Sequence, residues 1–194
     1  MENYYLPKEY QERKNNQYFD DTPYKDEFQN DVYEEAKKIV ENNNYSNIVD
    51  IGTGSGYKLI KYFNEYNTIG VDLKPTVQFL NKTYPNKTWC ELEFVDKNVD
   101  FDLIICSDVI EHIDDLNLFL NNLNSFSFKK IIFSTPDKFN MYQCEHLGPP
   151  TNSAHVREWN MKELNEYLSI MYKIEKQFKS SETSNTQIAI CSKK

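Results

Sequence analysis

Residues 49–56 read Val-Asp-Ile-Gly-Thr-Gly-Ser-Gly, which places three of the five glycines of the chain within five positions. The β-branched run 47–51 predicts a strand that leads into this turn. The apolar spacing of residues 57–63 predicts a helix that follows it. Glycine permits a positive φ and close approach of a ligand to the backbone, and a helix N-terminus presents free N–H groups. The stretch therefore predicts a strand–turn–helix unit built around a ligand.

The same alternation continues on both sides of this unit. A helix is expected at residues 25–43, and a further helix is expected at 75–84, at 114–124 and at 161–171. Strands are expected at 68–72, 87–94, 101–107 and 130–134, and the pair 172–179 and 186–192 is expected to form an antiparallel hairpin. Strands that alternate with helices indicate an α/β fold with a mostly parallel, doubly wound, Rossmann-like sheet. We expect two parts: an N-terminal helical cap at residues 1–44 and a ligand-binding domain at residues 45–194.

Composition excludes several classes of protein. The net charge is −8, and no basic face is visible, so nucleic acid is not expected as a partner. The four cysteines form no C-x-x-C pair, and no segment has the length of a membrane span or the pattern of a signal peptide. A reducing cytoplasm is therefore the expected location. The oligomeric state is not predicted.

Two acidic residues decide between the cofactors that such a glycine turn can bind. A dinucleotide motif of the form G-x-G-x-x-G requires glycine at position 57, where Tyr57 stands. Asp50 lies two residues before Gly52 and would repel a pyrophosphate, whereas it favours the sulfonium and ammonium groups of S-adenosylmethionine. Asp72 ends the second expected strand, where an acid accepts hydrogen bonds from ribose hydroxyls. We expect S-adenosylmethionine, with NAD and a glycine turn without ligand as the alternatives.

Four stretches then resemble motifs of the class I S-adenosylmethionine-dependent methyltransferases. They are VDIGTGSG, IGVDL, FDLIICSDVIEHI and IIFSTPD, and the third is similar to the ubiquinone-biosynthesis-like group. The resemblance implies a seven-stranded sheet whose last strand is antiparallel. It also implies cofactor contacts at the glycine turn, at the ribose and adenine, and at the methionine end. The implied cofactor-binding residues are Asp50, Gly52, Thr53, Gly54, Gly56, Asp72, Leu73, Glu91, Ser107 and Asp108.

The candidate catalytic residues are two histidines, because His is the side chain whose pKa suits a base near neutral pH. His112 follows the fourth expected strand, and ligands bind beyond the carboxyl ends of parallel strands. His155 lies in the long segment 137–160, which is expected to form a lid over the methyl acceptor. Part of this segment resembles the H-x-R-E-W stretch of a bacterial subgroup of small-molecule methyltransferases linked with surface sugars. The expected substrate-binding residues are Glu111, His146, Asn152, Arg157 and Trp159.

The three histidines match no usual metal-ligand spacing, so no metal site is predicted. For Trp159 the alternative is plain packing, and the N-terminal aromatic residues with Arg13 are expected to fold over the cofactor. We expect methylation of a small hydroxylated acceptor, a sugar or sugar nucleotide. The alternatives are an amine, carboxyl or quinone-type acceptor, or a non-catalytic module that only binds S-adenosylmethionine.

Overall fold

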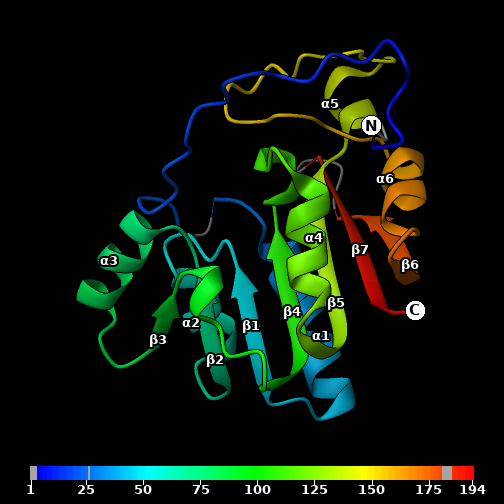
Figure 1. Ribbon diagram of the computed structural model, residues 1–194. Coiled ribbons are helices and arrows are strands. Elements are labelled where there is room, and N and C mark those ends of the chain that lie inside the picture. Colours follow the sequence, from blue (N-terminus) through cyan, green and yellow to red (C-terminus); the bar gives the residue numbers. More distant parts are fainter. Residues whose placement is uncertain (1–3, 26, 181–184) are drawn as a thin grey trace.

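A seven-stranded sheet organises the protein, for which a computed structural model describes residues 4–25, 27–180 and 185–194. The strand order is β3-β2-β1-β4-β5-β7-β6 (Figure 1). The strands are β1 Asn47–Ile51, β2 Asn67–Val71, β3 Thr88–Cys90, β4 Asp100–Ser107, β5 Ser127–Pro136, β6 Tyr172–Lys179 and β7 Thr186–Lys193. All pairs from β3 to β5 are parallel, and β7 is antiparallel to both β5 and β6. The predicted mostly parallel sheet with an antiparallel C-terminal strand is confirmed.

Helices cover both faces of this sheet. They are α1 Asn30–Asn43, α2 Tyr57–Phe63, α3 Lys74–Thr83, α4 Leu116–Asn124, α5 Lys138–Tyr142 and α6 Met161–Leu168, with the 3-10 helices η1 Leu92–Phe94 and η2 Ile110–His112. Along β4, Leu103 and Ile105 face the core under α1 and α2, whereas Ile104 and Cys106 face the core under α4 and α6. Successive side chains of a strand point to opposite faces. This is why a central parallel strand is apolar throughout.

The ends of several elements differ from the sequence prediction. The expected strand 87–94 is shortened to β3. This edge strand pairs only with the last three residues of β2, which ends at Val71. The helix expected from residue 25 begins at Asn30, after Gln29 takes a left-handed conformation. The helix expected from residue 114 begins at Leu116, because the carboxylate of Asp115 caps it by accepting from the N–H of Leu118. The expected turn between β6 and β7 falls on residues 181–184, outside the described residues.

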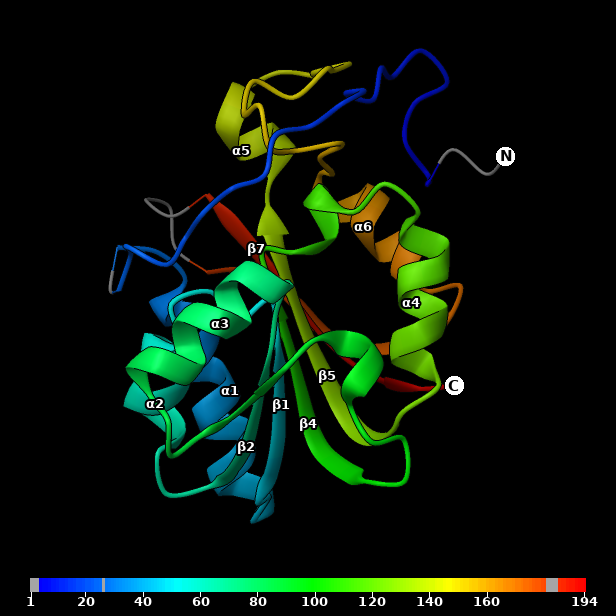
Figure 2. The same ribbon diagram turned by 60° about the vertical axis from the view of Figure 1, so that its left-hand side comes forward.

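Two irregular segments lie together above the carboxyl ends of the strands. We call residues 4–25 the N-terminal segment and residues 143–160 the lid; they run side by side in both views (Figures 1 and 2). The backbone N–H of Gln11 donates to Leu147 O (2.8 Å), that of Arg13 to Val156 O (2.8 Å) and that of Gln17 to Ser153 O (2.9 Å).

Of the expected N-terminal helical cap, only α1 is helical among the described residues. It buries Val32, Ala36 and Val40 against the sheet. The division at residue 44 stays a prediction. In the structure α1 packs into the same core cluster as α2. None of the described helices has the length and apolar character needed to cross a membrane.

Candidate active site

The glycine turn joins β1 to α2 in a left-handed backbone conformation. The φ angles of Gly52, Gly54 and Gly56 are +74°, +55° and +69°, a region that residues with a Cβ rarely adopt. A Cβ at Gly52 would lie 2.3 Å from Val109, so this glycine lets the loop after β4 approach the turn. A Cβ at Gly56 would lie 2.7 Å from Leu80, so the third glycine also lets α3 pack close to the turn.

Asp50 lies fully buried beneath the turn. Its Oδ2 accepts hydrogen bonds from the hydroxyls of Tyr33 (2.9 Å) and Thr53 (2.8 Å), whereas its Oδ1 has no partner among the described residues. Burial raises the pKa of Asp50 to about 6, and the hydrogen bonds from Thr53 and Tyr33 oppose this shift. A buried carboxylate with an unpartnered oxygen leaves negative potential beneath the turn. A cationic ligand bound at the turn would be favoured by it.

A cavity of about 560 Å³, here the cofactor cavity, opens beside the turn. It contains six of the predicted cofactor-binding residues: Gly52, Asp72, Leu73, Glu91, Ser107 and Asp108. Its lining includes five acidic residues and no Lys or Arg among the described residues. A cationic sulfonium and ammonium fit such a lining, whereas a pyrophosphate would be repelled.

Asp72 ties the cofactor cavity to the turn. Its Oδ2 accepts from the N–H of Gly54 (2.8 Å) and its Oδ1 from the N–H of Leu73 (2.7 Å). Burial raises the pKa of Asp72, and these backbone donors lower it. Asp21 of the N-terminal segment lies against the same turn, since a Cβ at Gly54 would meet its Oδ2 at 2.0 Å. Burial, and then the charge of Asp72, raise the pKa of Asp21 to about 6.

A second cavity of about 540 Å³, here the acceptor cavity, lies beyond β4 and β5. Four residues line both cavities: Phe19, Asp21, Asp108 and His112. Four of the residues expected at the chemistry, Glu111, His112, Asn152 and His155, line the acceptor cavity. The structure therefore brings both predicted catalytic histidines to the acceptor cavity, and His112 lies where the two cavities meet.

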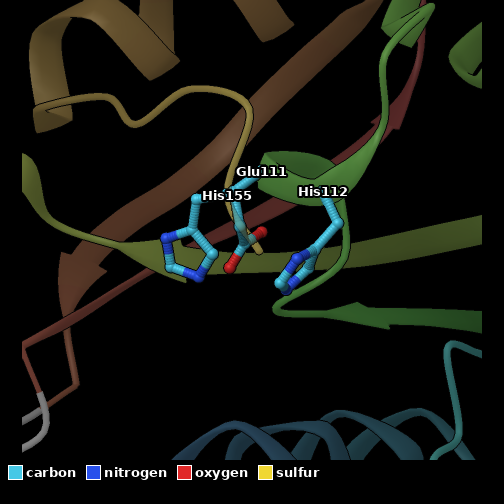
Figure 3. Close-up of side chains that lie close together, drawn as sticks. All are labelled: Glu111, His112 and His155. Carbon is cyan, nitrogen blue, oxygen red and sulfur yellow. The ribbon is translucent and has the colours of Figure 1, made fainter. Parts of the chain in front are cut away.

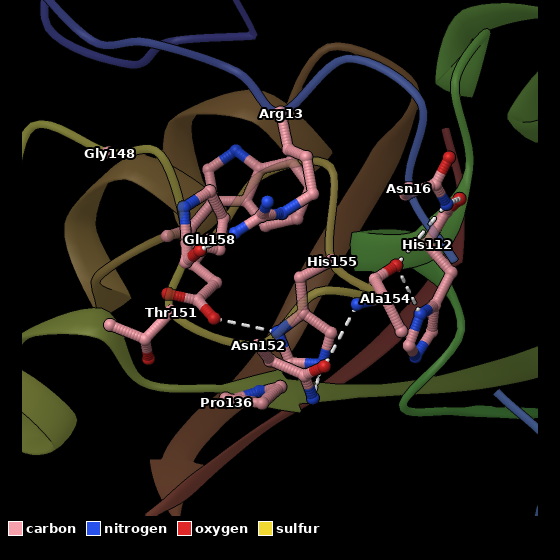
Figure 4. A network of polar contacts seen from close by, with 12 residues as sticks. Arg13, Asn16, His112, Pro136, Gly148, Thr151, Asn152, Ala154, His155 and Glu158 are labelled. Atoms are coloured by element: carbon pink, nitrogen blue, oxygen red, sulfur yellow. Dashed lines mark hydrogen bonds and ion pairs between the residues drawn. The ribbon is translucent and has the colours of Figure 1, made fainter. Parts of the chain in front are cut away.

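Hydrogen bonds fix the two imidazole rings. His112 Nδ1 lies 2.9 Å from Ala154 O, and His155 Nδ1 lies 2.6 Å from a carboxylate oxygen of Glu158 (Figure 4). Because both partners accept, each Nδ1 carries the proton and each Nε2 keeps its lone pair. Burial lowers the pKa of His112, although the Ala154 carbonyl opposes this effect. His112 is therefore a neutral imidazole at pH 7.

Glu111 lies between the two rings and is fully buried (Figure 3). Neither carboxylate oxygen has a hydrogen-bond partner among the described residues. Burial, and then the charge of Asp108, raise the pKa of Glu111 well above its ordinary value. The Thr135 hydroxyl is close enough to lower this pKa somewhat, but it too lacks a partner at hydrogen-bonding geometry.

The lid and the N-terminal segment hold this site together. Asn152 Nδ2 lies 3.0 Å from His155 Nε2, and Asn152 Oδ1 accepts from the N–H of Ala154 (2.9 Å). Asn16 donates to the carbonyls of His112 (3.0 Å) and Ala154 (3.2 Å), which links η2 to the lid (Figure 4). The N–H of Val156 donates to Glu111 O (2.7 Å).

Three predicted substrate-binding residues lie outside both cavities. Arg157 is buried and donates to Glu12 and to the carbonyls of Ile113 (2.6 Å) and Asp114 (2.9 Å). Trp159 is buried, and its indole N–H donates to Tyr4 O (3.1 Å). These two contacts correct the expected roles, because both side chains fasten the lid to its surroundings.

The third predicted substrate-binding residue outside the two cavities is His146. Its ring stacks on that of Tyr142, with 3.7 Å between ring centroids.

The sequence did not indicate two residues that the structure places beside the glycine turn. Tyr33 stands at an apolar stripe position of α1, so its hydrogen bond to Asp50 had no local signal. Asp21 belongs to a polar stretch without periodicity. Only the path of the N-terminal segment over the sheet brings it to the turn.

Comparisons with known proteins identify the family of this chain. The sequence model of a methyltransferase domain family matches residues 17–181, so the chain belongs to that family. It is a class I S-adenosylmethionine-dependent methyltransferase. The ubiquinone-biosynthesis-like subgroup stays a prediction. No curated protein matches the chain.

Solved structures share the fold at low sequence identity. The methyltransferase domain of bacterial CtHen1 is 19% identical, with a TM-score of 0.66 over 84% of this chain and 97% of that one. Magnesium protoporphyrin IX methyltransferase from Synechocystis, with bound S-adenosylhomocysteine, is 16% identical, with a TM-score of 0.62 over 84% and 82%. The 1,6-didemethyltoxoflavin-N1-methyltransferase of Burkholderia thailandensis is also 16% identical, with a TM-score of 0.61 over 84% and 78%. These proteins act on different acceptors, so the likeness concerns the fold.

Proposed function

We propose that this methyltransferase transfers the methyl group to a hydroxyl of a small acceptor, a sugar or sugar nucleotide. The observation that carries the proposal is the meeting of the two cavities at Asp108 and His112. His112 offers the lone pair of its Nε2 there, and the ring of His155 lies 4.8 Å away between centroids. A hydroxyl has to lose its proton as it attacks, whereas a free amine does not need a base. The cytoplasm is the proposed location, since all four cysteines are free thiols.

The cofactor cavity supplies the contacts for S-adenosylmethionine. Gly52, Asp72, Ser107 and Asp108 would hold it, and the acidic lining would favour its two cationic groups. When bound, S-adenosylmethionine supplies a methyl group activated by the sulfonium. Within this site the chain positions the acceptor oxygen and accepts its proton at the imidazole cluster.

The acceptor cavity has a mixed lining that suits a sugar. Phe19 and Tyr24 are stacked with 5.9 Å between ring centroids, and both line the cavity together with Gln29, Asn152 and Ser55. Aromatic faces offer apolar contact area, and amides and hydroxyls both donate and accept hydrogen bonds. An acceptor with an apolar ring face and many hydroxyls uses both kinds of surface.

An acceptor screen that follows release of S-adenosylhomocysteine tests this function. Sugars and sugar nucleotides are compared with amines, carboxylic acids, quinols and a short RNA. We expect turnover with a hydroxylated sugar compound. His112→Ala should lower it by roughly 10²–10⁴-fold, as expected when a positioned proton acceptor is lost, and the exposed-surface variant Lys162→Ala should retain it. Turnover with amines, acids, quinols or RNA and none with sugars would refute the proposed acceptor class.

A further inference from the structure

Three donor groups meet at the wall of the acceptor cavity. Glu111, His112 and His155 each offer one ligand atom, and these atoms all lie within 4.8 Å of one another. Figure 3 shows the carboxylate of Glu111 between the two imidazole rings. Glu111 and His112 come from η2, whereas His155 comes from the lid, 43 positions further on. The set therefore exists only when the lid is closed onto η2.

The carboxylate of Glu111 lacks any visible counterpart. It is fully buried, and neither oxygen has a hydrogen-bond partner in the described part of the chain. Buried carboxylates in proteins are normally hydrogen-bonded, paired or bound to a metal. A group with two free acceptor oxygens at a cavity wall thus indicates a missing positive partner.

Both imidazoles are oriented as metal ligands are. Each is held through Nδ1, His112 by the Ala154 carbonyl and His155 by the Glu158 carboxylate. This leaves Nε2 of each ring with its lone pair. A carboxylate or carbonyl behind the ring is the usual outer contact of a metal-ligating histidine. Asn152 donates to Nε2 of His155, and a cation would take its place.

The surrounding charge is negative. Asp108 and Glu158 are the carboxylates nearest to this set, Asp108 with Ser134 as its hydrogen-bond donor and Glu158 with Tyr142. Among the described residues, neither these carboxylates nor Glu111 forms an ion pair with Lys or Arg. A divalent cation would balance this charge.

We propose that Glu111, His112 and His155 bind one divalent transition-metal cation whose open coordination positions face the acceptor cavity. Two imidazole nitrogens and one carboxylate form a known ligand set for such cations. Ligands at about 2.0–2.2 Å from a metal stand roughly 3 Å apart. Side-chain rotation therefore has to shorten the longest separation by less than about 2 Å.

The role of the cation rests on the proposed function, although its binding does not. A bound cation takes the acceptor hydroxyl oxygen as a further ligand and lowers its pKa. The O–H bond breaks and its proton passes to water; the oxygen forms the new bond to the methyl carbon, and the S–C bond breaks to leave S-adenosylhomocysteine. The imidazoles then act as ligands, and the cation takes over the activation of the hydroxyl.

Metal binding is measured by calorimetry on the full chain after treatment with EDTA, with MnCl₂ or CoCl₂ alone. We expect one equivalent to bind. Glu111→Gln keeps the size of the side chain and removes its charge, and it should weaken binding by more than tenfold. Glu158→Gln should weaken binding by about 10–100-fold, as loss of an outer contact does. The matched control His146→Ala removes a histidine outside the set and should bind as the wild type does.

Each outcome decides the proposal. Absence of binding to the folded wild-type chain, or equal binding by Glu111→Gln, would overturn it; circular dichroism and S-adenosylmethionine affinity show that each variant is folded. Methyl transfer to a sugar that survives EDTA would overturn the role of the cation and leave the proposed function standing. Metal binding without turnover of any hydroxylated acceptor would refute the proposed function and leave the metal site standing.

Discussion

Replacing Asp50 by Asn should change how the stability of the cofactor-free protein depends on pH. Burial raises the pKa of Asp50 to about 6 from its ordinary 3.8. A raised pKa means that folding opposes the charged form. The contribution of the protonated acid to the free energy of unfolding is fully present below pH 3.8 and is lost as the pH rises through 6.

The size of the effect follows from that shift. A shift of about two pKa units corresponds to ~3 kcal/mol of destabilisation once the group is fully ionised. Between pH 4 and pH 7.5 the free energy of unfolding of the wild type should therefore fall by about 2–3 kcal/mol relative to that of Asp50→Asn. Asn retains an oxygen that can accept from Tyr33 and Thr53. Any difference in the free energy of unfolding that does not depend on pH cancels, because the comparison is made between two pH values.

Urea unfolding at pH 4, 5, 6 and 7.5 measures this difference. The control is Asp102→Asn, because that carboxylate also is mostly buried but lies away from the site. Burial opposes its ionisation, but hydrogen bonds from Lys129 and from the N–H groups of Ser46 and Asn47 lower the pKa of Asp102 to about 2. Its stabilising contribution is present above pH 3.8 and is lost as the pH falls towards 2. Asp102→Asn should thus be less stable than the wild type by a nearly constant amount from pH 4 to pH 7.5.

A second readout connects the buried charge to function. Asp50→Asn should bind S-adenosylmethionine roughly tenfold more weakly at pH 7.5, equivalent to ~1.4 kcal/mol, because the negative potential beneath the turn is lost. A difference in the free energy of unfolding that stays constant from pH 4 to pH 7.5 would refute the argument that burial raises the pKa of Asp50. Unchanged cofactor affinity would refute its role in favouring a cation.

Three further variants test other parts of the structure. Gly56→Ala forces a left-handed φ on a residue with a Cβ and pushes it against Trp89; urea unfolding should show a loss of at least ~1–2 kcal/mol. Arg157→Lys removes the guanidinium fork that reaches the carbonyls of Ile113 and Asp114 together and should cost about 1–3 kcal/mol, and an unchanged melting temperature would contradict the lid-fastening role. Asp21→Asn removes a carboxylate whose pKa is raised to about 6 by burial and by Asp72; thermal scans should show a gain over wild type at pH 7.5 that shrinks towards pH 4.

The layers of the fold follow from short-range patterns. Residues 47–51 and 100–107 are apolar on both faces, and the glycine turn needs left-handed angles that few other residues adopt. Asp72 could be placed because it directly follows the strand that pairs with β1. His112 could be placed because it follows β4 at the ligand edge of a parallel sheet. Such signals need only the periodicity of a strand or helix and the order of neighbouring elements.

The role of Arg157 shows what those signals cannot give. Arg157 was expected to bind the substrate, yet its guanidinium is buried and donates to the carbonyls of Ile113 and Asp114. Backbone carbonyls that are covered by a packed segment need a donor. That need arises only after η2 and the lid have packed together.

The sequence by itself determined the parallel sheet, the glycine turn and the acids beside it, because each depends on residues close together in the chain. Only the tertiary structure decided that Glu111, His112 and His155 meet, and that Asp21 reaches the glycine turn. These contacts join segments separated by more than 30 positions. Their geometry depends on how the N-terminal segment and the lid cross the sheet, a path held by backbone hydrogen bonds such as that from Gln17 to Ser153. Backbone bonds of this kind carry no side-chain signature, which is the physical reason that the spacing of the histidines in the sequence did not show that these three side chains meet.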